Sequence, residues 1–194
     1  MKENKLIIAS SNKGKINEFQ KILPDCECIP QSIFNISDVE ETGKDFEENA
    51  ILKAKNAFTK TNISSVGDDS GLIVPAINNE PGLYSARYAG LNATDSDNRN
   101  KLISKLKDNK LESTYAYFFC CIVAVGIKGQ NEIIVCDGKV EGEVRTIERG
   151  EKGFGYDPMF YPKGYSESFA ELNSLEKNKI SHRGQALKKL MDKF

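Results

Sequence analysis

Two adjacent carboxylates, Asp68 and Asp69, lie within the segment Gly67-Asp68-Asp69-Ser70-Gly71, with apolar runs before and after it. The pattern predicts a strand that ends, turns on the two glycines and resumes, which places the acids where α/β sheets form ligand clefts. Adjacent side chains diverge in an extended backbone, so the two acids are expected to do different jobs. Carboxylate oxygens suit Mg²⁺, which shares its remaining positions with water and phosphates. A polar turn is the alternative, because Gly, Asp and Ser dominate turns.

A polar loop follows the first predicted strand, Lys5–Ala9, and precedes a predicted helix that stops at Pro24, after which Glu27–Pro30 is predicted as a short second strand. A strand, a short glycine loop and a helix together present backbone N–H groups and a positive dipole end to phosphate. Lys13 and Lys15 would add point charges there. The spacing of a Walker A loop is absent. An ordinary turn with solvated lysines is the alternative, and this stretch alone favours it.

The acidic segment from Glu40 to Asp45 predicts the start of a second helix, with Thr42 and Asp45 at capping-box spacing. An apolar stripe continues this helix to about residue 60. Acids in this position usually complement the helix dipole. Glu40 or Glu41 is instead a second metal ligand if the amino end of the helix faces Asp69.

Strand patterns dominate the middle of the chain, after a helix that begins at Thr94 or Asp95. A hairpin is predicted from Tyr115–Ile127 and Asn131–Cys136, joined by Lys128-Gly129-Gln130, and Lys139–Arg145 resembles a third antiparallel strand. Intermixed strands and helices followed by antiparallel strands predict one mixed α/β domain in two lobes.

Two segments near the carboxyl end combine glycine or charge with aromatic side chains. The segment Gly150–Pro158 holds three glycines around two aromatic residues, which suggests a backbone that approaches another group closely. His182, the only histidine, stands beside Arg183 where a terminal helix begins, with Met191 and Phe194 expected to face inward. A structural turn and a capping feature, respectively, are the alternatives.

Composition limits the classes of function. The chain has 194 residues, 39% hydrophobic and 28% charged, which fits a single domain spanning residues 1–194. A net charge of −1 gives no electrostatic case for nucleic acid or membrane binding. The five cysteines are odd in number and form no C-x-x-C pair, so a disulfide framework or zinc site is not expected. We therefore expect a reducing, cytoplasmic setting.

Six motifs in order carry a family resemblance over essentially the whole chain. They occupy residues 10–15, 41–50, 68–72, 81–88, 153–158 and 176–184. Each motif alone is weak, whereas six in register are specific. On these residues the sequence closely resembles the inosine/xanthosine triphosphate pyrophosphatases, which remove noncanonical purine nucleotides. Gly67 stands where an alanine is common in that family.

The resemblance implies an α/β fold with an elongated mixed β-sheet flanked by helices, and two lobes with a central active-site cleft. It also implies a homodimer, dependence on Mg²⁺, and a purine nucleoside triphosphate substrate such as ITP, dITP or XTP. Cleavage between the α- and β-phosphates would give a nucleoside monophosphate and pyrophosphate.

The resemblance further implies roles for individual residues. Asp69 would be the catalytic carboxylate and a metal ligand, and Glu40 the other metal-binding acid. Lys15, with Lys53, would clamp the phosphates. The substrate-binding residues implied are Ser10, Ser11, Asn12, Lys13, Gly14, Lys15, Ser70, Phe154, Gly155, Tyr156, Asp157, Lys177, His182 and Arg183. An ionised aspartate is a weak base at its usual pKa of about 3.9, so Asp69 either removes a proton or orients water.

Base selection has a chemical logic. Hypoxanthine and xanthine present an acceptor at O6 and a donor at N1, and adenine presents the reverse, so a matched pocket leaves its polar groups unpaired with adenine. We hypothesise that Phe154 stacks on the base while Arg183 or His182 reads O6. Two other functions are a nucleotide sensor without hydrolysis and a broad metal-dependent phosphatase.

Overall fold

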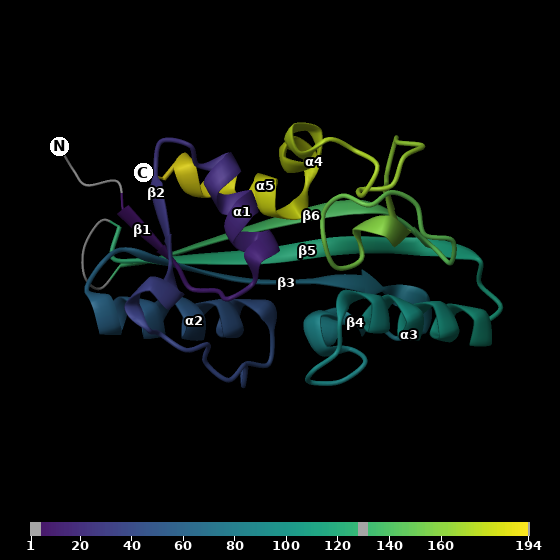
Figure 1. Ribbon diagram of the computed structural model, residues 1–194, viewed down its shortest axis with the longest axis horizontal. Helices are drawn as coiled ribbons and strands as arrows, with labels where there is room; N and C mark the ends of the chain where they lie inside the picture. Colours follow the sequence, from purple (N-terminus) through teal and green to yellow (C-terminus); the bar gives the residue numbers. More distant parts are fainter. Residues whose placement is uncertain (1–4, 128–131, 194) are drawn as a thin grey trace. The chain divides into compact units, whose positions relative to one another are not determined.

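The computed structural model describes residues 5–127 and 132–193 (Figure 1). The chain forms two compact units. Unit 1 contains the described residues up to Asp69, then Cys120–Gly138, and the described residues from Arg183 on. Unit 2 contains Ser70–Phe119 and Lys139–His182. Three strands, β3, β5 and β6, contribute residues to both units, so the units are not successive stretches of chain. The expected single domain over residues 1–194 stays a prediction.

Unit 1 holds a parallel part of the sheet with helices on both faces (Figure 1). Strand β1 pairs in parallel with β2 and with β3. The elements of this unit are β1 (Lys5–Ile8), α1 (Lys13–Ile22), β2 (Glu27–Pro30), η1 (Gln31–Phe34), α2 (Phe46–Thr61), the first half of β3 (Ser65–Val74), parts of β5 (Ser113–Val125) and β6 (Ile133–Arg145), and α5 (His182–Met191) from Arg183 on. The motif at residues 10–15 lies in this unit, and so do residues 67–69 of the motif at residues 67–71.

The side-chain alternation along the strands separates two cores in unit 1. Leu6 and Val66 pack with Phe19 of α1 and Leu187 of α5 on one face of the sheet. Residues one position along point the other way, and Ile7 packs with Ala57 of α2 on the opposite face. This alternation decides which helices Asp68 and Asp69 meet.

Unit 2 is built from the antiparallel part of the sheet and its own helices. Strand β4 pairs antiparallel with β3, and β7 pairs antiparallel with β6. Its further elements are η2 (Pro75–Ile77), β4 (Glu80–Pro81), η3 (Gly82–Arg87), α3 (Asp95–Asp108), η4 (Asp157–Met159), β7 (Phe160–Pro162) and α4 (Ser174–Ile180). Its core includes Leu72, Leu102, Phe118, Phe160 and Phe169.

Within the described residues the sheet has seven strands, in the order β2-β1-β3-β5-β6-β7, with β4 paired to β3. Parallel and antiparallel pairings coexist, which confirms the predicted mixed α/β class. The expected β1 and β2 are present, and β2 has the predicted bounds. In the same described ranges, no helix has the length and apolar character needed to cross a membrane.

Two predictions about strands were wrong. Strand β3 runs unbroken from Ser65 to Val74 through the glycine motif, so the chain does not turn there. A Cβ at Gly67 would lie 2.2 Å from the carbonyl oxygen of Ala50 in α2, so this glycine permits close packing instead of a turn. The segment Lys139–Arg145 is the second half of β6, not a separate strand. The predicted turn Lys128-Gly129-Gln130 lies outside the described residues.

Helix ends also differ from expectation. Helix α1 begins at Lys13 because the Asn12 side chain caps it by accepting the Lys15 N–H at 3.0 Å. Helix α2 is capped by Asp45, which accepts from the N–H of Glu48, so the predicted capping box at Thr42 was wrong. Thr94 caps α3 in a capping box with Asp97. Met191 is exposed, contrary to expectation, and Phe194 lies outside the described residues.

Candidate active site

The two aspartates of β3 point to opposite faces of the strand, as predicted from their adjacency. Asp68 is buried on the face shared with α1 and α5, where Arg183 and Glu18 lie. Asp69 is buried on the face covered by α2, where Asn49 and Lys53 reach it. All of these residues belong to unit 1.

Asp68 is surrounded by donors. Arg183 donates from Nε to Oδ2 at 2.7 Å and from a terminal nitrogen to Oδ1 at 3.1 Å, while Lys15 Nζ lies 2.5 Å from Oδ1. The Cys120 thiol donates to Oδ2 at 3.0 Å. Burial by itself would raise the pKa of Asp68, but Arg183 and Lys15 hold that pKa well below its usual range. Asp68 is therefore a fixed anion whose oxygens are already occupied.

Arg183 is itself fully enclosed, with a relative exposure of 1%. Its remaining terminal nitrogen donates to Glu18 Oε2 of α1 at 2.6 Å. The guanidinium thus joins α5, β3 and α1 through two carboxylates. These contacts place Arg183 between α1 and Asp68 of β3.

Asp69 has a sparser set of partners. Lys53 Nζ donates to Oδ1 at 2.8 Å, and Asn49 Nδ2 donates to Oδ2 at 3.2 Å. Burial raises the pKa of Asp69, and the neighbouring ammonium groups of Lys53 and Lys15 offset this only in part. The surroundings on the two faces of β3 therefore lower the pKa of Asp68 and raise the pKa of Asp69.

Lys53 occupies a position between two carboxylates. Its ammonium lies 2.8 Å from Asp69 Oδ1 and 2.5 Å from Glu41 Oε1. Burial alone would lower the pKa of Lys53, but Asp69 and Glu41 raise it. Lys53 and Lys15 also both donate to the backbone carbonyl of Asp68, at 3.2 and 3.3 Å, so two ammonium groups converge on one point of β3.

The donor set suits a cation that takes most of its ligands from water and substrate. Within the described ranges no group of three or more His, Cys, Asp or Glu side chains converges on one point. Asp69 and Glu41 nevertheless share one cation, the Lys53 ammonium, and this shows that both acids can face a positive charge there. Glu40, the acid implied by the resemblance, is exposed one position before Glu41. Such sparse carboxylate ligation is typical of Mg²⁺.

The predicted phosphate segment, Ser10 to Lys15, leads into the amino end of α1. Ser10 Oγ accepts the N–H of Asn12 at 3.1 Å, and the Ser11 hydroxyl donates to Asp38. Lys13 is exposed, whereas Gly14 and Lys15 are half-buried. The start of α1 at Lys13 puts the positive end of the helix dipole at these residues.

Most of the predicted base-binding residues lie in unit 2 and form one cluster. Asp157 Oδ2 accepts the N–H of Phe154 at 2.8 Å and the ammonium of Lys177 at 2.5 Å. Lys177 Nζ lies 5.0 Å from the centre of the Phe154 ring, a cation–π arrangement. A Cβ at Gly153 would lie 2.0 Å from Asp157 Oδ2, so the loop closes on the carboxylate only with glycine there.

Neighbouring side chains fix the rest of this loop. Gly155 donates its N–H to Asp95 at 2.7 Å and accepts from Arg99 at 2.9 Å, and the Tyr156 hydroxyl donates to the carbonyl of Ser85 at 2.9 Å. The loop is therefore anchored to α3 and to η3.

His182 and Ser70 complete the predicted set in unit 2. The imidazole of His182 stacks on Phe118, with ring centres 4.7 Å apart and planes 8° from parallel. Ser70 follows Asp69 on β3 and is half-buried. His182 is thus held by an aromatic ring and is not the exposed helix-start residue of the alternative interpretation.

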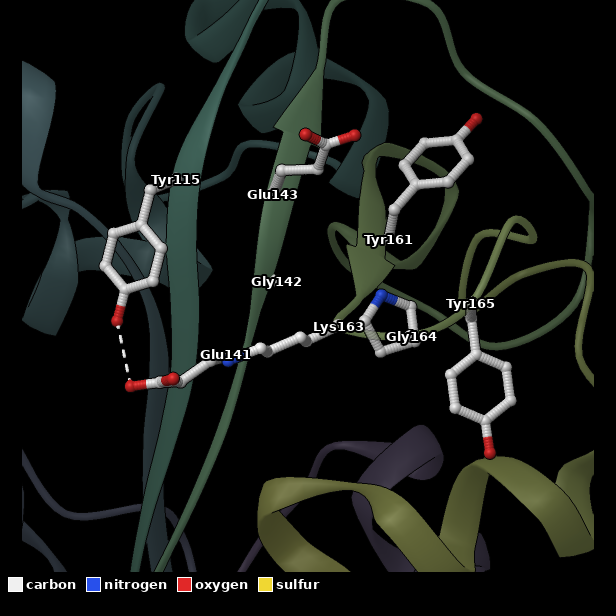
Figure 2. A pocket seen from close by; sticks show the side chains of 9 residues that line it. Tyr115, Glu141, Gly142, Glu143, Tyr161, Lys163, Gly164 and Tyr165 are labelled. Atoms are coloured by element: carbon white, nitrogen blue, oxygen red, sulfur yellow. Dashed lines mark hydrogen bonds between the residues drawn. The ribbon is translucent and has the colours of Figure 1, made fainter.

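A separate pocket of about 420 Å³ in unit 2 contains none of the predicted site residues (Figure 2). Its lining comprises Tyr115, Glu141, Gly142, Glu143, Tyr161, Pro162, Lys163, Gly164 and Tyr165. Both carboxylates already have cationic partners, since Lys139 lies 2.8 Å from Glu141 and Arg145 lies 2.5 Å from Glu143. The pocket therefore contains neither Asp69 nor the two lysines, Lys15 and Lys53, that converge on β3.

The sequence reasoning gave no role to three residues that the structure brings to the aspartates: Glu18, Asn49 and Cys120. Asn49 lay inside a motif but carried no assignment, although a polar residue at an alanine-rich helix position was a usable signal. Glu18 is 165 positions from its partner Arg183, a distance that no local pattern bridges.

The fold and the β3 site define a class of protein. It is a mixed α/β protein in which two lysines, Lys15 and Lys53, converge on one strand, and two acids, Asp69 and Glu41, share the Lys53 ammonium. Comparison with known proteins identifies the family, since the Ham1 family profile matches residues 6–193. A Legionella pneumophila protein named dITP/XTP pyrophosphatase is 47% identical, covering 98% of this chain and 97% of its own. A Bacillus anthracis protein of the same name is 42% identical, with 97% and 95% covered.

Solved structures agree with these sequence relationships. A HAM1 protein from Coxiella burnetii matches with a TM-score of 0.84 at 43% identity, covering 96% of this chain and 95% of that one. The Ham1 protein of Staphylococcus aureus matches with a TM-score of 0.82 at 44% identity, covering 97% and 96%. The chain belongs to the Ham1 family.

Proposed function

We propose that this protein hydrolyses noncanonical purine nucleoside triphosphates, among them dITP, ITP and XTP, to the monophosphate and pyrophosphate. The names of relatives that match over nearly their full length support this assignment. The observation that carries it is the Lys53 ammonium held between Asp69 and Glu41, beside Lys15 and the start of α1. This arrangement pairs a cation position with phosphate-binding groups.

A divalent cation, Mg²⁺ in our proposal, fits the donor set described above. Asp69 would hold it, with Glu40 as the resemblance implies or Glu41 as the contacts favour. When bound, such a cation supplies charge neutralisation at the phosphate oxygens. Lys53 neutralises the same carboxylates, so with a cation held there its ammonium would be available to the phosphates.

The chain's own groups then hold the triphosphate. Lys15 and Lys53 both donate to the Asp68 carbonyl, so two positive charges lie close together beside β3. We propose that the segment from Ser10 to Gly14 adds polar and backbone donors at the amino end of α1. Asp68 and Arg183 fix the direction from which Lys15 approaches.

Asp69 is proposed as the group that orients or deprotonates the attacking water. At an ordinary aspartate pKa it would be a weak base, and burial raises that pKa. A raised pKa strengthens the carboxylate as a proton acceptor near neutral pH.

Base selection is assigned to the cluster in unit 2. We propose that Phe154 stacks on the purine, that Gly155, Tyr156 and Lys177 border it, and that Asp157 holds the loop in place. That Arg183 or His182 reads O6 stays a prediction; the commitment of the Arg183 guanidinium to Asp68 and Glu18 favours His182. Ser70 is proposed to contact the substrate beside Asp69.

Two further properties are proposed, the first from the family resemblance and the second from the cysteine content. We expect a homodimer in solution and a cytoplasmic location. Size-exclusion chromatography with light scattering tests the first, and fractionation of source cells tests the second.

Turnover of ITP, dITP, XTP, GTP and ATP, with and without Mg²⁺ and a chelator, tests the proposed function. Pyrophosphate and monophosphate should form from the first three substrates, and chelation should abolish the reaction. Orthophosphate as the product would support a broad phosphatase instead, and binding without product would support a sensor. Preference for GTP or ATP would contradict the proposed specificity.

A further inference from the structure

Asn49 carries a buried amide with both ends engaged. The side chain lies in the first turn of α2, with a relative exposure of 1%. Its Oδ1 accepts the N–H of Gly43 at 2.8 Å, and its Nδ2 donates to Asp69 Oδ2 at 3.2 Å. One amide therefore bridges the segment that precedes α2 and the carboxylate of β3.

Hydrogen-bond chemistry permits only one orientation of this amide. The backbone N–H of Gly43 can only donate, and an ionised carboxylate can only accept. An amide turned by 180° would place donor against donor and acceptor against acceptor, leaving buried polar groups unsatisfied. The direction Gly43 N–H to Asn49 to Asp69 is thus fixed by the partners themselves.

Two glycines allow this bridge to be short. A Cβ at Gly43 would lie 2.6 Å from Asn49 Oδ1 and 2.8 Å from Asn49 N. A Cβ at Gly67 would lie 2.2 Å from the carbonyl oxygen of Ala50, the residue after Asn49. The segment before α2 and strand β3 both approach Asn49 more closely than any side chain at these positions would allow.

The bridge leaves Asp69 with a defined geometry. Lys53 holds Oδ1 and Asn49 holds Oδ2, so rotation of the carboxylate about its own axis is restrained at both oxygens. Glu41, two residues before Gly43, contacts the same Lys53. The amide consequently couples the position of the acidic segment, Glu40 to Asp45, to the orientation of the Asp69 carboxylate.

We propose that Asn49 is a positioning residue that sets the orientation of the Asp69 carboxylate and ties the acidic segment to it. The proposal rests on the proposed function, because Asn49 acts through Asp69 and not on substrate. Groups that orient a metal-binding or catalytic carboxylate typically affect metal affinity or activity about 10- to 100-fold.

Asn49→Asp and Asn49→Ala separate the two halves of the bridge. The aspartate variant keeps an acceptor for Gly43 but loses the donor to Asp69, whereas the alanine variant loses both. For both variants we expect kcat on ITP to fall about 10- to 100-fold with KM changed less than about threefold. Mn²⁺ affinity without nucleotide, measured by electron paramagnetic resonance, should fall by a similar factor. Asn56→Ala on the same helix is the control and should match the parent.

Unfolding curves on the same samples correct each rate and affinity for the folded fraction. Parent-like kcat and Mn²⁺ affinity in the folded fraction of both variants would overturn the proposal. So would an impaired alanine variant beside a parent-like aspartate variant, because the Gly43 contact alone would then explain the effect. If the parent protein releases no pyrophosphate, the proposed function fails, and the Mn²⁺ titrations still decide the role of Asn49.

Discussion

Asp68 and Asp69 are neighbours of the same residue type, and the two faces of β3 treat them in opposite ways. On the face of α1 and α5, Asp68 meets Arg183, Lys15 and the Cys120 thiol, and its pKa falls well below the usual range. On the face of α2, Asp69 meets one lysine and one amide, and burial raises its pKa. Asp68 therefore serves the structure, whereas we propose that Asp69 takes a metal or a proton.

The comparison explains how one strand can supply both rigidity and chemistry. The charges around Asp68 compensate one another inside the protein, so this face is a fixed support. The cation beside Asp69 is the Lys53 ammonium, which Glu41 shares. Five substitutions would break or sharpen this contrast.

The largest expected effect is on stability, from Arg183→Ala. Removing the guanidinium takes the Arg183 ion pair away from buried Glu18 and from buried Asp68, and breaking a buried ion pair in this way costs about 3–5 kcal/mol. Urea unfolding measures the loss. Arg145→Ala is the matched control, because its ion pair with Glu143 is only half-buried and contributes about 1 kcal/mol or less. Equal, small losses in the free energy of unfolding of both variants would contradict a structural role for Arg183 and Asp68.

Lys53→Met should act on turnover more than on folding. In the proposed function the Lys53 ammonium would make charge-assisted hydrogen bonds to the phosphates, worth about 1.5–3 kcal/mol, so kcat/KM for ITP should fall about 10- to 150-fold. Steady-state kinetics measure the change. Lys55→Met, at an exposed position two residues along α2, should leave kcat/KM unchanged. A parent-like Lys53→Met enzyme would show that the lysine is only a counterion.

Gly67→Ala tests the close contact between β3 and α2. The added Cβ would meet backbone atoms of Ala50 and Ala54, which cannot rotate away, so α2 must shift. Overpacking of this kind costs about 1–3 kcal/mol, and we expect a matching loss in the free energy of unfolding. The rate of ITP hydrolysis should fall as well, because Asn49 and Lys53, which contact Asp69, move with α2. An alanine variant as stable as the parent would contradict the packing argument.

The smallest effect is in the pH dependence of stability. The lowered pKa of Asp68 means that its ionised form stabilises the fold above the unfolded pKa of about 3.9, and this contribution disappears as pH falls through the folded pKa. Asp68→Asn should therefore be less stable than the parent at pH 7, with a deficit that shrinks only below about pH 4.

The raised pKa of Asp69 has the opposite sign, because the fold disfavours its ionised form at neutral pH. Asp69→Asn should be at least as stable as the parent at pH 7, with any gain shrinking as pH falls through the folded pKa of Asp69. Unfolding in urea at several pH values measures both variants. Equal pH profiles for the two variants would refute the opposite shifts.

The sequence was sufficient for the parts of the fold that local patterns encode. The first two strands, the helix from Phe46 and the cap at Thr94 follow from periodicity and capping chemistry. The unbroken course of β3 was missed, because Gly67 and Gly71 have the composition of a turn. Their role is to admit neighbouring backbone, which is a tertiary property and leaves no trace in a single sequence.

The candidate site divides in the same way. The divergence of Asp68 and Asp69 followed from strand geometry alone. The partners that distinguish the two acids come from α1, α2 and α5, and their contacts span up to 165 positions of chain. The assignment of Glu40 over Glu41 depended on family resemblance, whereas the contact of Glu41 with Lys53 required coordinates.

Pyrophosphate release from ITP by Asp69→Asn in the presence of Mg²⁺ tests the central claim most directly. The account predicts a rate at least about 100-fold below that of the parent protein, the lower limit for losing an acid–base group. The variant should stay folded, because the position favours a neutral side chain. Pyrophosphate release by the asparagine variant at the parent's rate would contradict the claim that Asp69, on the α2 face of β3, is the catalytic carboxylate.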